Sequence, residues 1–386
     1  MLRPHLRDAI EEIEYEVRVH VFDGVAAADA EYARVVHEVI DETVAHFVNS
    51  LGEADPSSAE LAVLYARLGA EAARRGFQPD RLQTALRLSS QVACRRFIKD
   101  AYRFSWPKET LASLTDHLFE LLARAADAGA QGYARQQGRM ADDRAHHRDR
   151  LRDLLVREPP PAADAVAAQA GAADWTVPRT VAAVALLPAP QGRTPSRVLP
   201  PDVLANWDPT APYLLVPDPD SPGPERLNAL LGPVGTAAVG PTVPTARAAV
   251  SLRWARHTLA LVGRGILPAD RPVRSAEHTA LLAAARAEDL IDATSAAYLA
   301  PLLGLPAGRR LPLLATLLAY LECGGNAVTT GGRLHVHEQT VRYRLRRIAE
   351  LTGHSFQDPA GRLDLMLTLT WLVHTAGARR TIAPRN

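Results

Sequence analysis

The stretch from Asn326 to Gly353 places two amphipathic helical segments on either side of a short break, and this pattern restricts the fold most strongly. Leu334 and Val336 bracket the break, which we expect to be about one residue long. Beyond it, apolar residues recur at intervals of three and four, as on the buried face of a helix; they are Val341, Leu345, Ile348 and Leu351. The pattern predicts a helix from about Glu338 to Leu351, with Asn326 capping the helix before it and Gly353 stopping it.

The polar side of this second helix is rich in arginine. In a helix-turn-helix, the early residues of the second helix reach base edges in the major groove, while flanking cations hold phosphates. Gln339 suits the edge of adenine, and Arg342 suits guanine or a phosphate. Arg346 and Arg347 lie further along, where we expect contacts to the DNA backbone. The predicted DNA-binding residues are Arg333, His337, Gln339, Thr340, Arg342, Tyr343, Arg344, Arg346 and Arg347.

Positive charge is concentrated in this part of the chain. Residues 301–386 hold eleven Arg against five Asp and Glu, whereas the whole chain has a net charge of +1. A local basic surplus is typical of a surface that binds nucleic acid. The alternative is that the arginines form only the solvated face of a surface helix. We favour DNA binding because the short helix, the tight turn and the second helix occur together.

The same segment resembles the C-terminal helix-turn-helix of the PucR/CdaR family of bacterial transcriptional regulators. The resemblance runs from Leu313 to Leu372, and its hallmarks are Thr316, Leu317, Tyr320, Leu321, Asn326, Leu334, His337, Thr340, the run Arg342–Leu345, and Gly353. The sequence departs from the family at Gly331, where alanine is usual, and at Glu338 and Gln339, where Arg-Asn is common. The resemblance implies a sequence-specific DNA-binding regulator, and the second departure bears on which operator it recognises.

Residues 1–157 read as helix throughout and predict a sensor bundle of four or more helices. The amphipathic segments are Tyr32–Val44, Leu61–Leu68, Leu82–Phe97 and Leu111–Ala126, followed by a charged connecting helix over Asp142–Arg157. This last segment is either solvated or paired with its twin in a dimer. The stretch Ala66–Phe97 resembles the helical sensor domain of PucR-like regulators and of RsbR-type co-antagonists. Four histidines of the bundle (His20, His37, His46 and His117) lack i,i+3 or i,i+4 spacing, so we expect neither metal nor haem.

Residues 162–272 change to short apolar runs between Pro and Gly clusters, which predicts a small α/β domain. Strands are expected at Val181–Leu187, Tyr213–Val216 and Ala237–Val239, and helices at Asp202–Ala205, Arg226–Leu231 and Arg247–Leu261. The block resembles the central GGDEF-like domain of CdaR-type regulators but lacks the GGDEF signature. We therefore expect a degenerate domain without cyclase activity, which either contacts a small molecule or protein or serves as a structural spacer.

The complete chain is thus expected to be a multidomain, mainly α protein. Its predicted parts are the helical bundle (1–157), the degenerate GGDEF-like α/β domain (162–272) and an all-α helix-turn-helix domain (277–386). The sequence holds no phosphate-binding loop, dinucleotide fingerprint, H-E-x-x-H, C-x-x-C or G-x-S-x-G motif, so we expect no enzyme and no cofactor or metal.

The remaining expectations concern location and partners. Cys94 and Cys323 form no disulfide framework, the first residues are charged, and no apolar run suits a membrane span, which favours the cytoplasm. One helix-turn-helix buries too little surface for tight binding, so we expect a homodimer or higher homo-oligomer on double-stranded DNA. A signal, such as an unidentified small-molecule effector, is expected to act on the N-terminal or central domain. The alternative function is a protein-interaction regulator of the stressosome or anti-sigma kind.

Overall fold

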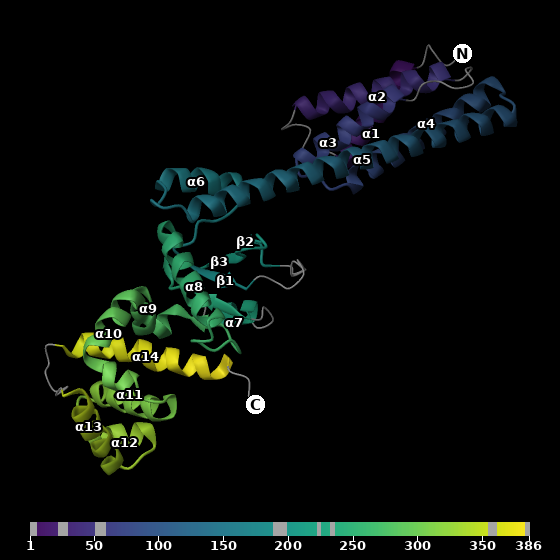
Figure 1. Ribbon diagram of the computed structural model, residues 1–386. Coiled ribbons are helices and arrows are strands. Elements are labelled where there is room, and N and C mark those ends of the chain that lie inside the picture. The colour runs from purple at the N-terminus through teal and green to yellow at the C-terminus, as the bar shows by residue number, and fades with distance from the viewer. Residues whose placement is uncertain are drawn as a thin grey trace. The chain divides into compact units, whose positions relative to one another are not determined.

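The computed structural model describes residues 6–21, 30–50, 59–187, 199–221, 225–231, 236–353 and 361–382. These residues form two compact units, Met1–Arg144 and Ala145–Asn386. Most of the described residues are helical, and a small sheet lies in the middle of the chain, so the predicted mainly α, multidomain fold is confirmed (Figure 1). In the described part of the chain, no helix is both long and apolar enough to cross a membrane.

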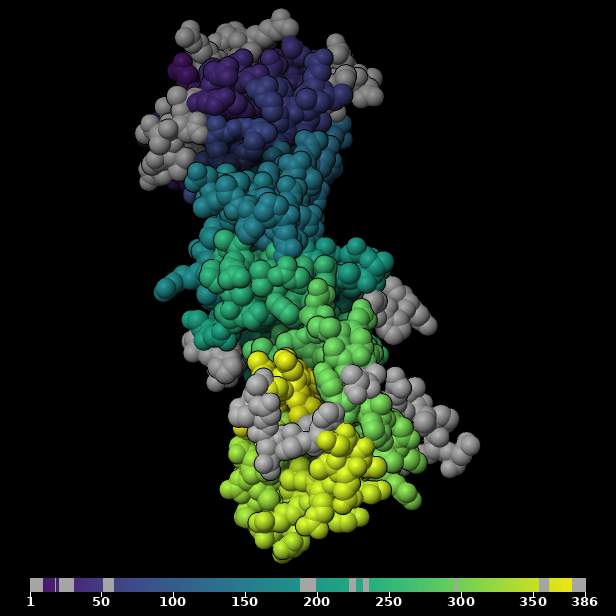
Figure 2. Space-filling view, turned by 60° about the vertical axis from the view of Figure 1, so that its left-hand side comes forward, coloured from purple at the N-terminus to yellow at the C-terminus, as the bar shows by residue number. Residues whose placement is uncertain are grey.

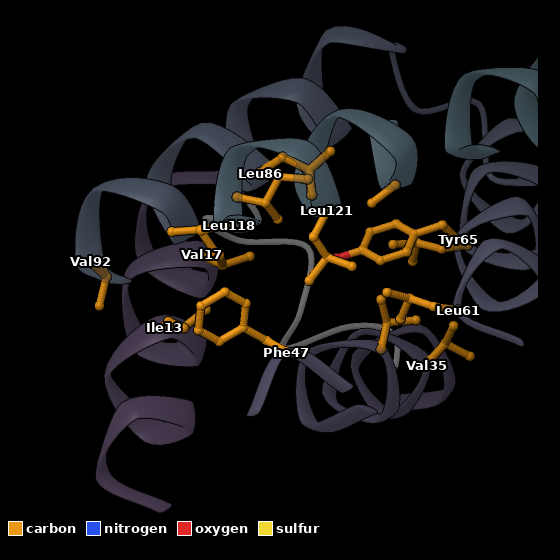
Figure 3. Packing of buried hydrophobic residues seen from close by; sticks show 14 of the residues in the cluster. Ile13, Val17, Val35, Phe47, Leu61, Tyr65, Leu86, Val92, Leu118 and Leu121 are labelled. Atoms are coloured by element: carbon orange, nitrogen blue, oxygen red, sulfur yellow. The ribbon is translucent and has the colours of Figure 1, made fainter. Parts of the chain in front are cut away.

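The first unit is a helical bundle. Its helices are α1 (Leu6–Val21), α2 (Ala30–Ser50), α3 (Ala59–Arg74), α4 (Asp80–Phe104) and the first part of α5 (Lys108–Leu155). Apolar stripes of all five helices meet in one core, and the four predicted amphipathic segments each lie in a helix. Figure 3 shows this core, which includes Ile13, Phe47, Tyr65, Leu86 and Leu118. The predicted N-terminal bundle is therefore confirmed.

Helix α5 runs unbroken from Lys108 to Leu155 and so joins two segments that were predicted as separate helices. The glycines between the two segments do not interrupt it. A Cβ added at Gly132 would lie 2.0 Å from the carbonyl oxygen of Ala66 on α3, and one added at Gly69 would lie 2.0 Å from that of Gly129. These glycines let the backbones of α3 and α5 approach closely, a role that only a residue without a side chain can fill.

The second unit contains a sheet with the strand order β2-β3-β1-β4-β6, and β5 also pairs with β1. The strands are β1 (Thr180–Leu186), β2 (Leu204–Asn206), β3 (Tyr213–Pro217), β4 (Ala237–Val239), β5 (Val243–Pro244) and β6 (Val273–Arg274). All pairs are antiparallel except β4 with β6, among the strands that the structure describes. Strand β1 is central and fully buried beyond its first residue, as expected for a continuous apolar run.

Helices cover both faces of this sheet. Val181 and Ala183 of β1 pack in a core with the end of α5, α6 (Ala163–Ala172) and α8 (Ala248–Gly263). Ala182 and Val184, which alternate with them, pack in a second core with α7 (Glu225–Leu231). The period of two along β1 thus separates the two layers. The predicted strands and the helices at α7 and α8 are confirmed, while the GGDEF-like assignment stays a prediction.

Strand β2 and helix α6 of the sheet domain differ from the sequence-based predictions, and the two-residue strands β5 and β6 were not predicted either. The predicted helix at Asp202–Ala205 is wrong, because Leu204–Asn206 is strand β2 and pairs with β3. So short a segment takes its conformation from its neighbour, and Leu204 is buried against the sheet. Helix α6 was not predicted. Its ten residues are rich in alanine, the residue with the highest helix propensity, but carry little amphipathic pattern.

The rest of the second unit is helical. It comprises α9 (Thr279–Arg286), α10 (Glu288–Leu303), α11 (Ala307–Glu322), α12 (Ala327–Leu334), α13 (Glu338–Thr352) and α14 (Arg362–Ile382). Leu314 and Leu317 of α11, Ile348 of α13 and Leu369 of α14 share one core. Trp371 of α14 instead packs with Leu261 of α8 in another. The sheet domain and the helical domain therefore meet in a common apolar cluster.

Candidate nucleic-acid interface

Helices α12 and α13 form a helix-turn-helix, and local capping groups fix where each helix begins. The Asn326 Oδ1 accepts hydrogen bonds from the backbone N–H groups of Val328, at 2.9 Å, and Thr329, at 3.2 Å. This satisfies two of the donors that are left free at the start of α12, so the predicted N-cap is confirmed. The imidazole Nδ1 of His337 accepts from the backbone N–H of Gln339, at 3.2 Å, and starts α13 in the same way.

The turn between the helices has three residues, His335 to His337, rather than the expected single residue. His335 adopts a left-handed conformation with φ 54°. The backbone N–H of Val336 donates to the carbonyl oxygen of Gly331, at 2.9 Å, which closes the end of α12. The apolar pattern could not show this turn, because its length depends on a backbone conformation that residues other than glycine adopt uncommonly.

The inner face of α13 holds the helix against the domain. Val341 and Ile348 are fully buried, and Leu345 and Leu351 are partly buried, as the periodicity predicted. Gly353 ends the helix at φ 69°, and its N–H donates to the carbonyl oxygen of Ala349, which confirms the predicted stop. Because this face of α13 is buried, the opposite face of the helix points to solvent.

The outer face of α13 carries most of the predicted DNA-binding side chains. The exposed residues of the predicted set are Arg333 of α12, His337 of the turn, and Gln339, Arg342, Tyr343, Arg346 and Arg347 of α13, whereas Thr340 and Arg344 are half-buried. Tyr343 is 66% exposed, a large fraction for an aromatic residue. Figure 2 shows residues of α11 to α13, in lime, at the surface of the second unit. The fold thus presents a polar, cationic helix face to solvent.

Three of these arginines form ion pairs within the domain. Arg333 contacts Glu322, at 2.6 Å, and Arg347 contacts Glu350, at 3.2 Å. Arg342 lies 3.8 Å from Glu338, one turn before it. Exposed ion pairs of this kind are worth about 0–1 kcal/mol, so a phosphate or base edge can compete for each arginine.

Arg344 differs from the other arginines because it points into the fold. Its Nη1 donates to Thr316 Oγ1 of α11, at 3.1 Å, and this hydroxyl donates to the carbonyl oxygen of Pro312, at 2.6 Å. Thr316 is completely buried. The arrangement fastens α13 to α11. The sequence signal for this contact was a polar residue within the apolar stripe of α11, but its partner could not be read from spacing.

The two glycines of α12 occupy different environments. A Cβ at Gly331 would lie 2.7 Å from the carbonyl oxygen of Val336, so alanine there requires the turn to shift. A Cβ at Gly332 would meet no atom within 4 Å.

We expect Gly332→Ala to stabilise the helix-turn-helix by up to about 1 kcal/mol, because alanine restricts the unfolded chain and favours helix. Urea unfolding monitored by circular dichroism should show this gain, with Gly331→Ala as the comparison. Equal gains in both variants would contradict the close approach at Gly331.

Two histidines of the bundle pair with residues of neighbouring helices. His37 contacts Glu14, and this hydrogen bond and the carboxylate charge raise the pKa of His37. His117 Nε2 lies 2.6 Å from Ser50 Oγ. Among the residues that the structure describes, no group of three or more His, Cys, Asp or Glu side chains could hold a metal ion.

Comparison with known proteins identifies both ends of the chain. Residues 1–156 match the PucR-like N-terminal domain, and residues 313–371 match the PucR C-terminal helix-turn-helix domain. The purine catabolism regulatory protein of Bacillus subtilis is 46% identical over 57 residues, which are 15% of this chain and 11% of that protein. An uncharacterized protein of Mycobacterium tuberculosis is 43% identical over 58 residues, again 15% of this chain and 14% of the relative. The similarity to these relatives therefore spans only a small part of their length.

A solved structure also shows similarity. It is the crystal structure of a regulator of polyketide synthase expression from Bifidobacterium adolescentis, with 19% sequence identity. The alignment covers 62% of this chain and 100% of that chain, with a TM-score of 0.30.

Proposed function

We propose that this chain, which belongs to the PucR family, is a transcriptional regulator that binds specific sequences of double-stranded DNA through α13. The observation that carries the proposal is the exposed face of α13, which presents Gln339, Arg342, Tyr343 and Arg346 while Val341 and Ile348 anchor the opposite side. An α-helix held in this way fits the major groove of B-DNA. The family assignment of the two end domains agrees with a regulatory role.

The proposed contacts divide by position along α13. Gln339 and Arg342 lie in its first turns, so we assign them to base edges, with adenine and guanine as the best matches. Arg333, Arg346 and Arg347 are assigned to phosphates, where they fix the register without reading sequence. We assign Thr340 and Tyr343 to DNA contacts that lie beside those of Gln339 and Arg342. His337 and Arg344 are positioning residues, because each is bonded to a neighbouring part of the domain.

The regulator is proposed to act as a homodimer in the bacterial cytoplasm. A single helix-turn-helix supplies few base contacts, and two copies reading half-sites one or more helical turns apart solve this problem. A signal received by the N-terminal or central domain would alter the placement of the two DNA-binding domains. The half-sites of the operator would then match the dimer in one state only.

The test of this proposal is DNA binding by single-residue variants. A bound sequence is first selected from genomic fragments, and affinity is then measured by fluorescence anisotropy. We expect Arg342→Ala to weaken binding to the selected site by about 1–3 kcal/mol, because it removes a base contact. Arg347→Ala should weaken binding to all sequences alike and reduce the slope of affinity against salt by about one.

The control is Arg253→Ala, which removes an exposed arginine of α8 outside the helix-turn-helix. It should leave both affinity and salt slope nearly unchanged. Unaltered affinity in Arg342→Ala would overturn the placement of the recognition helix. If the full-length chain shows no salt-dependent DNA binding and co-purifies with a protein partner, the alternative of a protein-interaction regulator is favoured.

A further inference from the structure

A cavity lies in the core of the N-terminal bundle, between α1, α2, α4 and α5. Its volume is about 90 Å³. Most of its lining is apolar and includes Ile13, Phe47, Val92, Ala93 and Leu118. In Figure 3 the side chains of Ile13, Phe47 and Leu118, from three different helices, point toward one another. A mainly apolar hollow between the helices of a bundle is a natural place for a small ligand.

The two hydroxyl groups in the lining have bonds within their own helices. Thr43 Oγ1 donates to the carbonyl oxygen of Val39, at 2.5 Å, and also lies 3.1 Å from the hydroxyl of Tyr65. Ser89 Oγ donates to the carbonyl oxygen of Ala85, at 2.9 Å. A buried water needs about two to four polar partners, which these groups supply poorly. The chemistry of the interior therefore favours an apolar occupant over water.

Charged groups occur in the lining only toward solvent, as far as the described residues show. Arg96 lines the cavity with a side chain that is 22% exposed, and its Nη1 lies 3.4 Å from Glu12 Oε2. Asp100, one turn further along α4, is half-buried. An apolar interior with a few polar groups at one side is the usual form of a small-molecule site.

We propose that this cavity binds one small, uncharged, mainly apolar molecule, no larger than a single aromatic ring or a short alkyl chain. Apolar cavities of about 150 Å³ bind benzene or xenon, and the smaller volume here sets the upper limit on size. The occupant fills space between α1, α2, α4 and α5 and so stabilises their packing. The binding site is inferred from the cavity alone and does not depend on the proposed function.

The first test uses benzene as the probe and hydrogen exchange of the full-length chain as the measurement. Some amides of α2 and α4 exchange their hydrogens only when the bundle unfolds. With benzene at about ten times its dissociation constant, this exchange should slow about tenfold. Ala93→Leu fills the cavity, so benzene should no longer slow exchange in this variant. Ala123→Leu, the same change at an exposed position of α5, should respond like the wild type. An unresponsive wild type, or an equal response in Ala93→Leu, overturns the proposal.

A second measurement covers the case in which Ala93→Leu does not fold. Crystals of the full-length wild-type protein under xenon pressure should show a xenon atom among Phe47, Val92 and Leu118, and an absent or differently placed atom overturns the proposal. DNA affinity, measured without benzene, separates the two hypotheses. If the wild-type chain does not bind DNA but benzene still slows its hydrogen exchange, the proposed function is wrong and the cavity site is retained.

Discussion

Replacing Gly132 with alanine is expected to lower the stability of the N-terminal bundle by about 3 kcal/mol, near the upper end of overpacking effects. The added Cβ would lie 2.0 Å from the carbonyl oxygen of Ala66 and 2.6 Å from its carbonyl carbon. Both atoms belong to the backbone of α3, so a rotamer change cannot relieve the clash and the helices must separate. Hydrogen exchange of α3 and α5 amides in the full-length chain would measure the loss.

Gly138→Ala is the matched control because it makes the same substitution six positions later in α5. A Cβ at Gly138 would meet no atom within 4 Å. Alanine is a better helix former than glycine by about 1 kcal/mol, so this variant should be slightly more stable than the wild type. If Gly132→Ala were also stabilising, the close approach of α3 and α5 would be refuted.

The helices of the bundle were predictable because their apolar residues follow the helical period over long segments. Strand β1 was also predictable, because it is a continuous apolar run in which six consecutive residues are buried. Strands β2 and β6 were not predictable, since two or three residues carry no period and form only by pairing with β3 and β4. The continuity of α5 was obscured by Gly129 and Gly132, which usually signal a break but here serve helix packing.

In the helix-turn-helix, sequence reasoning succeeded where the determinants are local. The cap at Asn326, the stop at Gly353 and the buried side of α13 depend only on nearby residues. It did not reveal that Arg344 bonds to Thr316, 28 positions earlier, and so serves the fold. The cavity of the bundle was equally invisible, because voids depend on how side chains of several helices pack together.

Trp371→Ala is expected to destabilise the second unit by about 3–5 kcal/mol, the usual cost of truncating a buried aromatic residue. Trp371 is 2% exposed and packs in one cluster with Leu261 and Val262 of α8 and Ile291 of α10. The guanidinium of Arg264 lies over its ring, 5.1 Å from the centroid. Urea unfolding of the full-length chain would measure the loss, and Leu363→Ala, at a 68% exposed position of the same helix, should cost less than about 0.5 kcal/mol.

The position of Trp371 also predicts which segments exchange their amide hydrogens faster in the Trp371→Ala variant. Arg264 directly follows α8 and forms a bidentate ion pair with Glu288 of α10, at 2.8 and 3.0 Å, which holds the pKa of Glu288 below its usual value. The sheet domain and the helical domain are thus joined by both an apolar cluster and an ion pair. If they unfold together, Trp371→Ala will speed hydrogen exchange in β1 as well as in α14. Faster exchange confined to α14 would show that the two domains unfold independently.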